Sequence, residues 1–137
     1  GINLKQKQKM LKLEKKTQGK ISHIGIVSKN SLINLYRKSR LVISPATYES
    51  SSLPILEALA CKTPVIASNT KPNLELNKKL NINLYSLNNS NSFIKSFREI
   101  WFNKSNYHKQ IFFNKKALKE YSWKLISQKY FEIFLKL

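Results

Sequence analysis

The sequence contains no aspartate, only two histidines and one cysteine, Cys61. Without aspartate, and with both histidines isolated, it supports no Ser-His-Asp arrangement for nucleophilic catalysis. No group of Cys, His and Glu has the spacing of a metal site, so we expect no metal and no other cofactor. The single cysteine and the lack of a secretory or transmembrane segment indicate a reducing compartment, and we predict that Cys61 is a small core residue.

Acidic residues are also scarce. The sequence has seven glutamates and 25 lysines and arginines, which give a formal net charge of +18. Such an excess attracts anionic partners, namely a diphosphate, an anionic membrane face or nucleic acid. The lysines are scattered from Lys5 to Lys136 without one dense block, which argues against a dedicated nucleic-acid-binding arm. A lysine- and asparagine-rich bias over a solvated surface would give the same charge, so this interpretation also stays open.

The length of 137 residues suits one domain with a single core. Because the sequence begins with Gly1 and not with methionine, we expect a fragment or a processed piece of a longer chain. The composition predicts a cytoplasmic protein, and its charge leaves open a peripheral place at the inner face of the membrane.

The most informative stretch runs from residue 41 to residue 67. Two short apolar runs, Leu41–Ile43 and Pro64–Ala67, flank a helical pattern, which predicts a strand, a helix and a second strand in a βαβ unit. Pro54 suits the first turn of that helix, and Ser52 is available to cap it.

Two glutamates bracket the start of this helix. Glu57 is the only charged residue from residue 53 to residue 61, and Glu49 lies eight positions earlier in the preceding loop. A carboxylate buried without a partner would be strongly destabilising, so packing alone does not explain Glu57. A helix N-terminus also favours phosphate. We therefore expect a binding site here, with Glu57 ionised and partly buried.

The apolar spacing of the rest of the chain predicts further elements. Strands are expected at residues 21–27, where His23 would be structural or exposed, and at residues 83–86. A basic amphipathic helix at residues 2–18 would pack one face or lie on a membrane surface. Other helices are expected at residues 30–39, from residue 74, and at residues 92–103, 106–121 and 121–137. Aromatic residues at helical spacing near the C-terminus favour core packing over stacking on bases.

The central stretch resembles the nucleotide-sugar-binding signature of the retaining GT-B glycosyltransferases, the group also called glycosyl transferases group 1 or family 4. The two glutamates match the E-x7-E motif of that group, and the resemblance covers most of the chain. The matching residues are Ser44-Pro45, Tyr48-Glu49, Leu53-Pro54, Glu57-Ala58, Ala60-Cys61 and Thr63 to Ala67.

The resemblance implies an α/β fold, a Rossmann-like doubly wound parallel sheet that forms the C-terminal half of a GT-B fold and is followed by C-terminal helices. Residues 1–137 would be a single C-terminal donor-binding domain, with residues 105–137 as its closing helical region. In relatives, a terminal helix that contains a tryptophan reaches back towards the N-terminal, acceptor-binding domain. That domain would precede Gly1, so we expect the isolated chain to be catalytically inactive.

The resemblance also implies the roles of individual residues. Glu49 would be the catalytic-site residue that faces the transferred sugar, and Glu57 would hold the ribose, since a carboxylate accepts strong hydrogen bonds from neighbouring hydroxyls. The remaining donor contacts would be Ser50, Ser51, Ser52 and Leu53 at the diphosphate and Val27, Ser28 and Lys29 at the nucleobase.

The chain departs from the family pattern at three places. Relatives commonly read Glu-Gly-Phe-Gly where this chain has Glu49-Ser50-Ser51-Ser52, so serines replace glycines, whose backbone can approach phosphate closely. Lys62 stands where a helix-ending glycine is usual, and a left-handed lysine costs on the order of 1 kcal/mol. The phosphate-binding Arg/Lys pair of the family would lie before Gly1.

The resemblance implies a retaining hexosyltransferase. Its donor would be a UDP- or GDP-linked sugar and its acceptor a saccharide or a lipid-linked molecule, as in polysaccharide biosynthesis. One alternative is a non-enzymatic basic module that binds nucleic acid or an anionic membrane surface, with steep salt dependence and no dependence on Glu49 or Glu57. Another is a related nucleotide-sugar epimerase, although the motif order favours the transferase.

Overall fold

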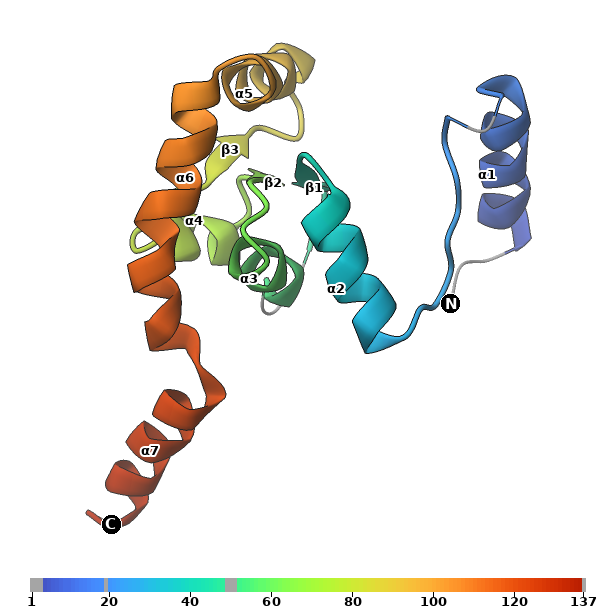
Figure 1. Cartoon of the computed structure of the whole chain (residues 1–137). Coiled ribbons are helices and arrows are strands. Elements are labelled where there is room, and N and C mark those ends of the chain that lie inside the picture. The colour runs from blue at the N-terminus through green and yellow to red at the C-terminus, as the bar shows by residue number, and fades with distance from the viewer. Residues whose placement is uncertain (1–3, 19, 49–51, 137) are drawn as a thin grey trace. The chain divides into compact units, whose positions relative to one another are not determined.

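The computed structural model describes residues 4–18, 20–48 and 52–136. It divides into two compact units, Gly1–Leu32 and Ile33–Leu137, which are described separately below. Figure 1 gives the order of the elements along the chain.

The first unit contains helix α1 (Leu4–Lys16) and an irregular segment that leads into helix α2 (Lys29–Lys38). The expected helix is confirmed. Leu11 and Leu13 are exposed within this unit, so the packed face predicted for the helix stays a prediction. The strand expected at residues 21–27 is also wrong. Gly25 has φ +71°, which interrupts an extended backbone, and Ile24 and Ile26 are exposed.

The second unit is built on a three-stranded parallel sheet in the order β1-β2-β3 (Figure 1). The strands are β1 (Val42–Ser44), β2 (Val65–Ser68) and β3 (Asn83–Tyr85). Strand β2 is central and is buried along its whole length, as its continuous apolar sequence predicts. The expected α/β fold is confirmed, since helices connect these parallel strands and cover both faces of the sheet, as in a Rossmann-like half of a GT-B fold.

Alternate side chains of β2 point to opposite faces of the sheet and define two cores. Val65 and Ala67 pack with helix α3 (Leu53–Ala60), and helix α4 (Lys71–Asn77) adds Leu76 to the same side. Ile66 packs on the other side with Tyr85 and with Ile100 of helix α5 (Ser90–Trp101).

Helix α5 is one of the predicted amphipathic helices, and it buries Ser96 and Ile100. Asn89 caps its N-terminus by accepting a hydrogen bond from the Ser92 N–H at 3.1 Å. The rings of Phe93, Phe97 and Trp101 follow one another along its inner face, with centroids 6.2 and 5.2 Å apart. The aromatic residues of this helix therefore pack against the sheet, as their spacing predicts.

Helix α6 (Lys104–Ala117) is hydrogen-bonded to the amino ends of β2 and β3 through the buried side-chain amides of Gln110 and Asn114. The side chain of Gln110 accepts a hydrogen bond from Val65 N–H at 2.6 Å and donates one to Val65 C=O at 3.1 Å. Asn114 makes the same pair of contacts with Asn81, at 2.7 and 2.9 Å. Each amide thus makes the hydrogen bonds to backbone N–H and C=O that an adjacent strand would otherwise make.

The chain ends in a short 3-10 helix, η1 (Leu118–Tyr121), and helix α7 (Trp123–Phe134). Helix α7 was expected to bury its aromatic side chains, and this prediction is wrong for the described residues. Trp123 is 75% exposed, and Tyr130, Phe131 and Phe134 are also exposed. Among the elements of this unit, α7 packs mainly against η1, so little of its apolar surface is covered.

Helix α3 ends in a Schellman motif. Thr63 N–H bonds to Ala58 C=O at 2.9 Å and Lys62 N–H bonds to Leu59 C=O at 3.0 Å. Lys62 has φ +64°, so the left-handed lysine predicted from the sequence is confirmed. Cys61, the C-cap residue, is half-buried, not fully buried as a core residue would be.

We expect Lys62→Gly to raise the free energy of unfolding by about 0.5–1 kcal/mol, because glycine adopts φ > 0 without the steric cost of a Cβ atom. The matched control is Lys78→Gly at the C-cap of α4, where φ is −66°. That change should lower stability by about 0.5–1 kcal/mol, since glycine gains nothing there and its unfolded chain is more flexible. Urea unfolding of the three proteins measures both effects, and equal effects at the two positions would contradict this account.

Candidate functional site

The candidate site lies where β1 ends and α3 begins. Pro54 occupies the first turn of α3, and Ser52 is the N-cap residue, as predicted. The Ser52 carbonyl accepts hydrogen bonds from Ile55 N–H at 3.1 Å and Leu56 N–H at 3.3 Å. The Ser52 hydroxyl, however, makes no cap hydrogen bond and turns to another partner.

That partner is Asn73 of α4, which is fully buried. Its Oδ1 accepts the hydrogen bond of Ser52 Oγ, and its Nδ2 donates to Ser68 C=O at 2.9 Å. Ser68 Oγ in turn donates to Ala46 C=O at 2.5 Å. These contacts join the loop after β1, the start of α3, the end of β2 and the helix α4. They fix the backbone at the carboxyl edge of the sheet, where parallel α/β folds place their ligands.

Sequence reasoning missed Asn73 and Ser68. Ser68 ends a buried strand, and Asn73 follows Pro72 in a short polar stretch. Both positions carry polar side chains next to apolar runs, but nothing in their spacing predicts that they contact each other or Ser52.

Glu57 lies one turn into α3, and its side chain is exposed. The expectation of a partly buried carboxylate is therefore wrong. The helix turns this position away from the core that Ile55, Ala58 and Leu59 form, and the carboxylate reaches solvent. Its Oε2 accepts a hydrogen bond from the hydroxyl of Tyr36 on α2, with an O···O distance of 3.2 Å.

Tyr36 is a third residue whose part in this site sequence reasoning missed. It is half-buried against the core on the α3 side of the sheet. Burial, reinforced by the charge and hydrogen bond of Glu57, raises the pKa of Tyr36 to about 12. The phenol therefore remains a hydrogen-bond donor to Glu57 throughout the physiological pH range.

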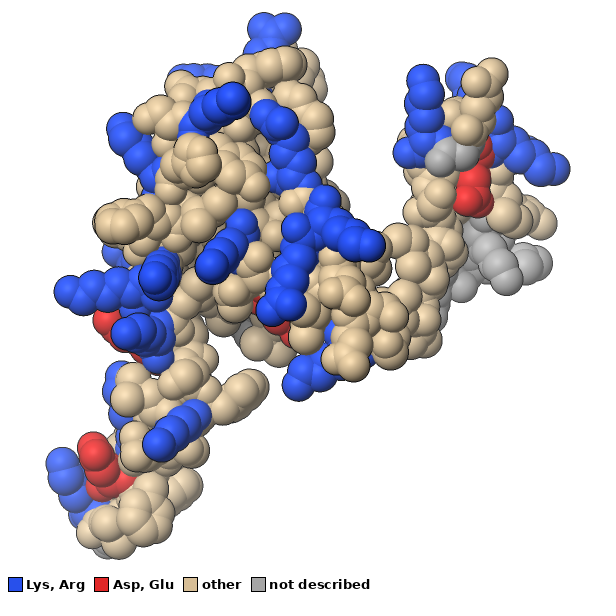
Figure 2. Space-filling model, in the orientation of Figure 1, with Lys and Arg blue, Asp and Glu red and all other residues tan. Residues whose placement is uncertain are grey.

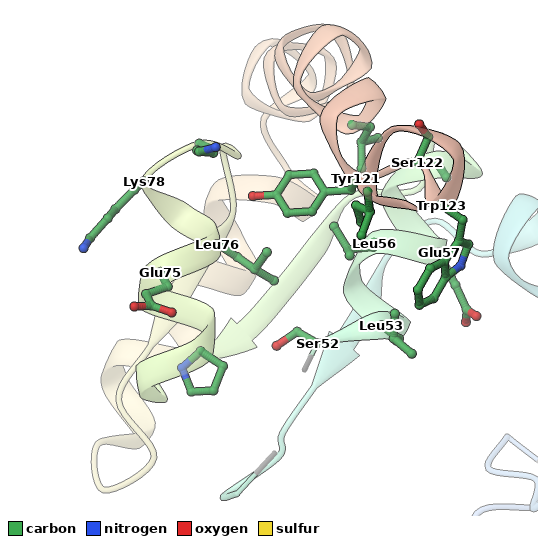
Figure 3. Close-up of a pocket in the computed structure, with 15 residues that line it drawn as sticks. Ser52, Leu53, Leu56, Glu57, Glu75, Leu76, Lys78, Tyr121, Ser122 and Trp123 are labelled. Carbon is green, nitrogen blue, oxygen red and sulfur yellow. The ribbon is translucent and has the colours of Figure 1, made fainter. Parts of the chain in front are cut away.

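An open cavity of about 840 Å³ runs along α3 and α4 and is also lined by η1 and the start of α7 (Figure 3). Its walls are mostly apolar, with Leu56 and Leu76 facing the space between the two helices. Among the predicted donor residues, Ser52, Leu53 and Glu57 line it. The cavity thus touches the predicted site at one end, while most of its volume lies along the helices.

The other predicted site residues are placed as follows. Glu49, Ser50 and Ser51 lie outside the described residues. Val27, Ser28 and Lys29 belong to the first compact unit, so their nearness to a nucleobase stays a prediction. There Ser28 caps α2, because its Oγ accepts a hydrogen bond from Ser31 N–H at 3.2 Å.

Positive charge is spread over the surface without one dense block on the face that Figure 2 shows. Among the described residues, Lys79 and Glu120 form an ion pair at 3.1 Å, with both side chains exposed. No group of three His, Cys or acidic side chains in the described ranges is arranged to hold a metal ion. In the part of the chain that the structure describes, no helix is long and apolar enough to cross a membrane.

Comparison with known proteins gives the family. Residues 1–117 match Glycosyl transferases group 1. The chain belongs to this glycosyltransferase family. It is also 42% identical over 52 residues to the O-antigen chain mannosyltransferase B of Escherichia coli, a match that covers 38% of this chain and 14% of that relative.

Membership of the glycosyltransferase family gives the site a chemical context. The family transfers sugars, so a nucleotide-sugar donor and a saccharide acceptor are its expected ligands. In this chain, the start of α3 is held by a buried polar network, and the exposed carboxylate of Glu57 lies one turn later. The resemblance drawn from the sequence to a glycosyltransferase is confirmed.

Proposed function

We propose that this chain is the donor-binding, C-terminal half of a retaining GT-B glycosyltransferase of family 4. The observation that carries the proposal is the exposed carboxylate of Glu57, one turn into a helix whose start lies at the carboxyl edge of a parallel sheet. The chain belongs to the glycosyl transferases group 1, and we take Glu57 to be the second glutamate of its E-x7-E motif.

A nucleotide sugar offers two neighbouring ribose hydroxyls and the hydroxyls of the sugar. A carboxylate accepts two directional hydrogen bonds from such a pair, each worth about 1.5–3 kcal/mol in a desolvated site. We assign the ribose to Glu57 and the transferred sugar to Glu49. The backbone N–H groups from Ser51 to Leu53, at the start of the helix, would face the diphosphate, because helix N-termini stabilise negative charge.

The reaction we propose needs no glutamate nucleophile. The glycosidic bond to the departing phosphate breaks on the face where the acceptor hydroxyl enters, and the leaving phosphate accepts the proton of that hydroxyl. The donor domain contributes by holding the donor in place and stabilising the leaving diphosphate. Metal-independent transfer and retention of configuration belong to this proposal.

The sugar and the nucleotide are further parts of the proposal. The relative named as a mannosyltransferase suggests mannose as the transferred hexose. We propose GDP or UDP as the nucleotide and a saccharide or lipid-linked acceptor in polysaccharide biosynthesis. A cytoplasmic location, with peripheral contact to the anionic inner membrane face, would suit a chain of net charge +18.

A second candidate function rests on the same charge and on the aromatic side chains that α7 exposes. A non-enzymatic basic module would bind an anionic membrane or nucleic acid through lysines and exposed rings. Its binding would fall steeply with salt and would not depend on Glu49 or Glu57.

Calorimetric titration separates the two functions. Glu57→Gln keeps the shape of the side chain and removes its charge, so binding of GDP or UDP should weaken by about 1–2 kcal/mol, roughly a factor of ten. Glu49→Gln should leave the free diphosphate nearly unaffected and weaken only GDP-mannose or UDP-glucose. Thermal stability of Glu57→Gln should stay within about 0.5 kcal/mol of the wild type, because the residue is exposed.

Each titration is made at low and at high salt, with Glu75→Gln as the matched control. Glu75 is another exposed glutamate, which lines the same cavity from α4. If Glu57→Gln and Glu49→Gln bind every ligand like the wild type while salt alone abolishes binding, the basic module is the better account.

A further inference from the structure

Tyr36 is held at three points of the second unit. Its backbone carbonyl accepts a hydrogen bond from Thr63 Oγ1 at 2.6 Å, next to the Schellman turn that ends α3. Its ring packs beside the buried core that Ile55 and Ala58 belong to. Its hydroxyl donates to Glu57 Oε2 at 3.2 Å. The donor position is therefore fixed relative to both ends of α3.

Glu57, by contrast, is an exposed side chain on the helix surface. An exposed glutamate samples several rotamers, and fixing one of them on ligand binding costs conformational entropy. The hydrogen bond from Tyr36 reduces this freedom before any ligand arrives. It also leaves Oε1 and the second lone pair of Oε2 available, because each carboxylate oxygen accepts two hydrogen bonds.

We propose that Tyr36 is a positioning residue, which orients the Glu57 carboxylate towards the two ribose hydroxyls of the nucleotide-sugar donor. This inference rests on the proposed function, since it needs Glu57 at the ribose. It goes beyond that function in assigning a role to a residue of α2 outside the E-x7-E motif. Tyr36 itself touches no ligand in this account.

The high pKa of the phenol agrees with this role. Because the pKa of Tyr36 is raised to about 12, the hydroxyl keeps its proton and donates at every pH at which a glycosyltransferase works. The pKa rises because burial and the neighbouring carboxylate both oppose the tyrosinate form.

The test compares ribonucleotides with analogues that lack both ribose hydroxyls. Wild type, Tyr36→Phe, Glu57→Gln and the double variant are titrated with GDP and 2′,3′-dideoxy-GDP, and with the corresponding uridine pair. The wild type should prefer the ribonucleotide about tenfold. Tyr36→Phe should weaken ribonucleotide binding about threefold to tenfold and leave dideoxynucleotide binding unchanged. In the Glu57→Gln background, Tyr36→Phe should add no further loss.

The other outcomes are distinct. Equal weakening of ribo- and dideoxynucleotides by Tyr36→Phe would mean a merely structural role, and tighter ribonucleotide binding would mean that Tyr36 competes for the carboxylate; either overturns the inference. If Glu57→Gln abolishes the preference and Tyr36→Phe keeps it, Tyr36 has no role but the proposed function stands. If the wild type has no preference, or Glu57→Gln retains it, the proposed function fails. Circular dichroism confirms that each variant is folded.

Discussion

Gln110→Ala is expected to lower the free energy of unfolding by about 3–5 kcal/mol, enough to unfold much of a marginally stable domain. Gln110 is 1% exposed, and its amide binds both backbone groups of Val65 and the Asn83 side chain. Truncation leaves a buried N–H and C=O of the central strand without this partner and opens a cavity of several atoms.

Two comparisons make this result specific. Gln110→Met keeps most of the volume and removes the hydrogen bonds, so it should still cost about 2–3 kcal/mol if the bonds matter more than the packing. Lys109→Ala, an exposed neighbour on α6, should change stability by less than about 0.5 kcal/mol. Chemical denaturation measures all three, and a Met variant as stable as the wild type would show that the amide contacts contribute little.

The second large effect is expected for Asn73→Ala, which should destabilise the domain by about 2–4 kcal/mol. Asn73 is fully buried and joins the Ser52 hydroxyl to the Ser68 carbonyl. Because these contacts hold the start of α3, the same variant should also weaken nucleotide binding at temperatures where it remains folded.

The exposed residue Lys71 at the start of the same helix provides the control. Lys71→Ala should leave both stability and nucleotide binding within about 0.5 kcal/mol of the wild type. Amide hydrogen exchange then locates the effect of Asn73→Ala. Faster exchange confined to the first turn of α3 and the end of β2 is the expected pattern, whereas uniform acceleration over the domain would mean that Asn73 supports the core and not the site.

Much of the second unit could be predicted from the sequence. The apolar runs at residues 41–43 and 64–67 predict the strands β1 and β2, and Ser52 and Pro54 predict the start of α3. The left-handed Lys62 was predicted because the family resemblance places a helix-ending glycine at this position, and its φ is positive. These features depend on local sequence.

The features that could not be predicted depend on long-range contacts. Gln110, Asn114 and Asn73 look like ordinary surface amides in the sequence, and only the folded chain brings each to a strand end. The segment at residues 21–27 has an apolar pattern, but Gly25 breaks the extended backbone. The aromatic residues of α7 have the spacing of a packed helix, but the described chain supplies no surface that covers them.

At the candidate donor site, too, the sequence predicted one residue, Glu57, and missed its long-range partner, Tyr36. The E-x7-E spacing predicted Glu57, and the structure places it on the surface beside Tyr36, a contact between residues that are 21 positions apart. No periodicity of either segment indicates this pair. The two side chains meet because Tyr36 of α2 and the helix α3 pack into the same core on one side of the sheet.

The most direct test of the central claim, that this chain binds a nucleotide at the start of α3, is to map the bound nucleotide by NMR. Uniformly 15N-labelled chain is titrated with GDP and with UDP at high salt, and amide shifts are followed residue by residue. The account predicts the largest shifts in residues 49–57, with smaller ones near Tyr36 and Asn73, and their loss in Glu57→Gln. Shifts that spread over the lysine-bearing helices and vanish as salt is raised would contradict it.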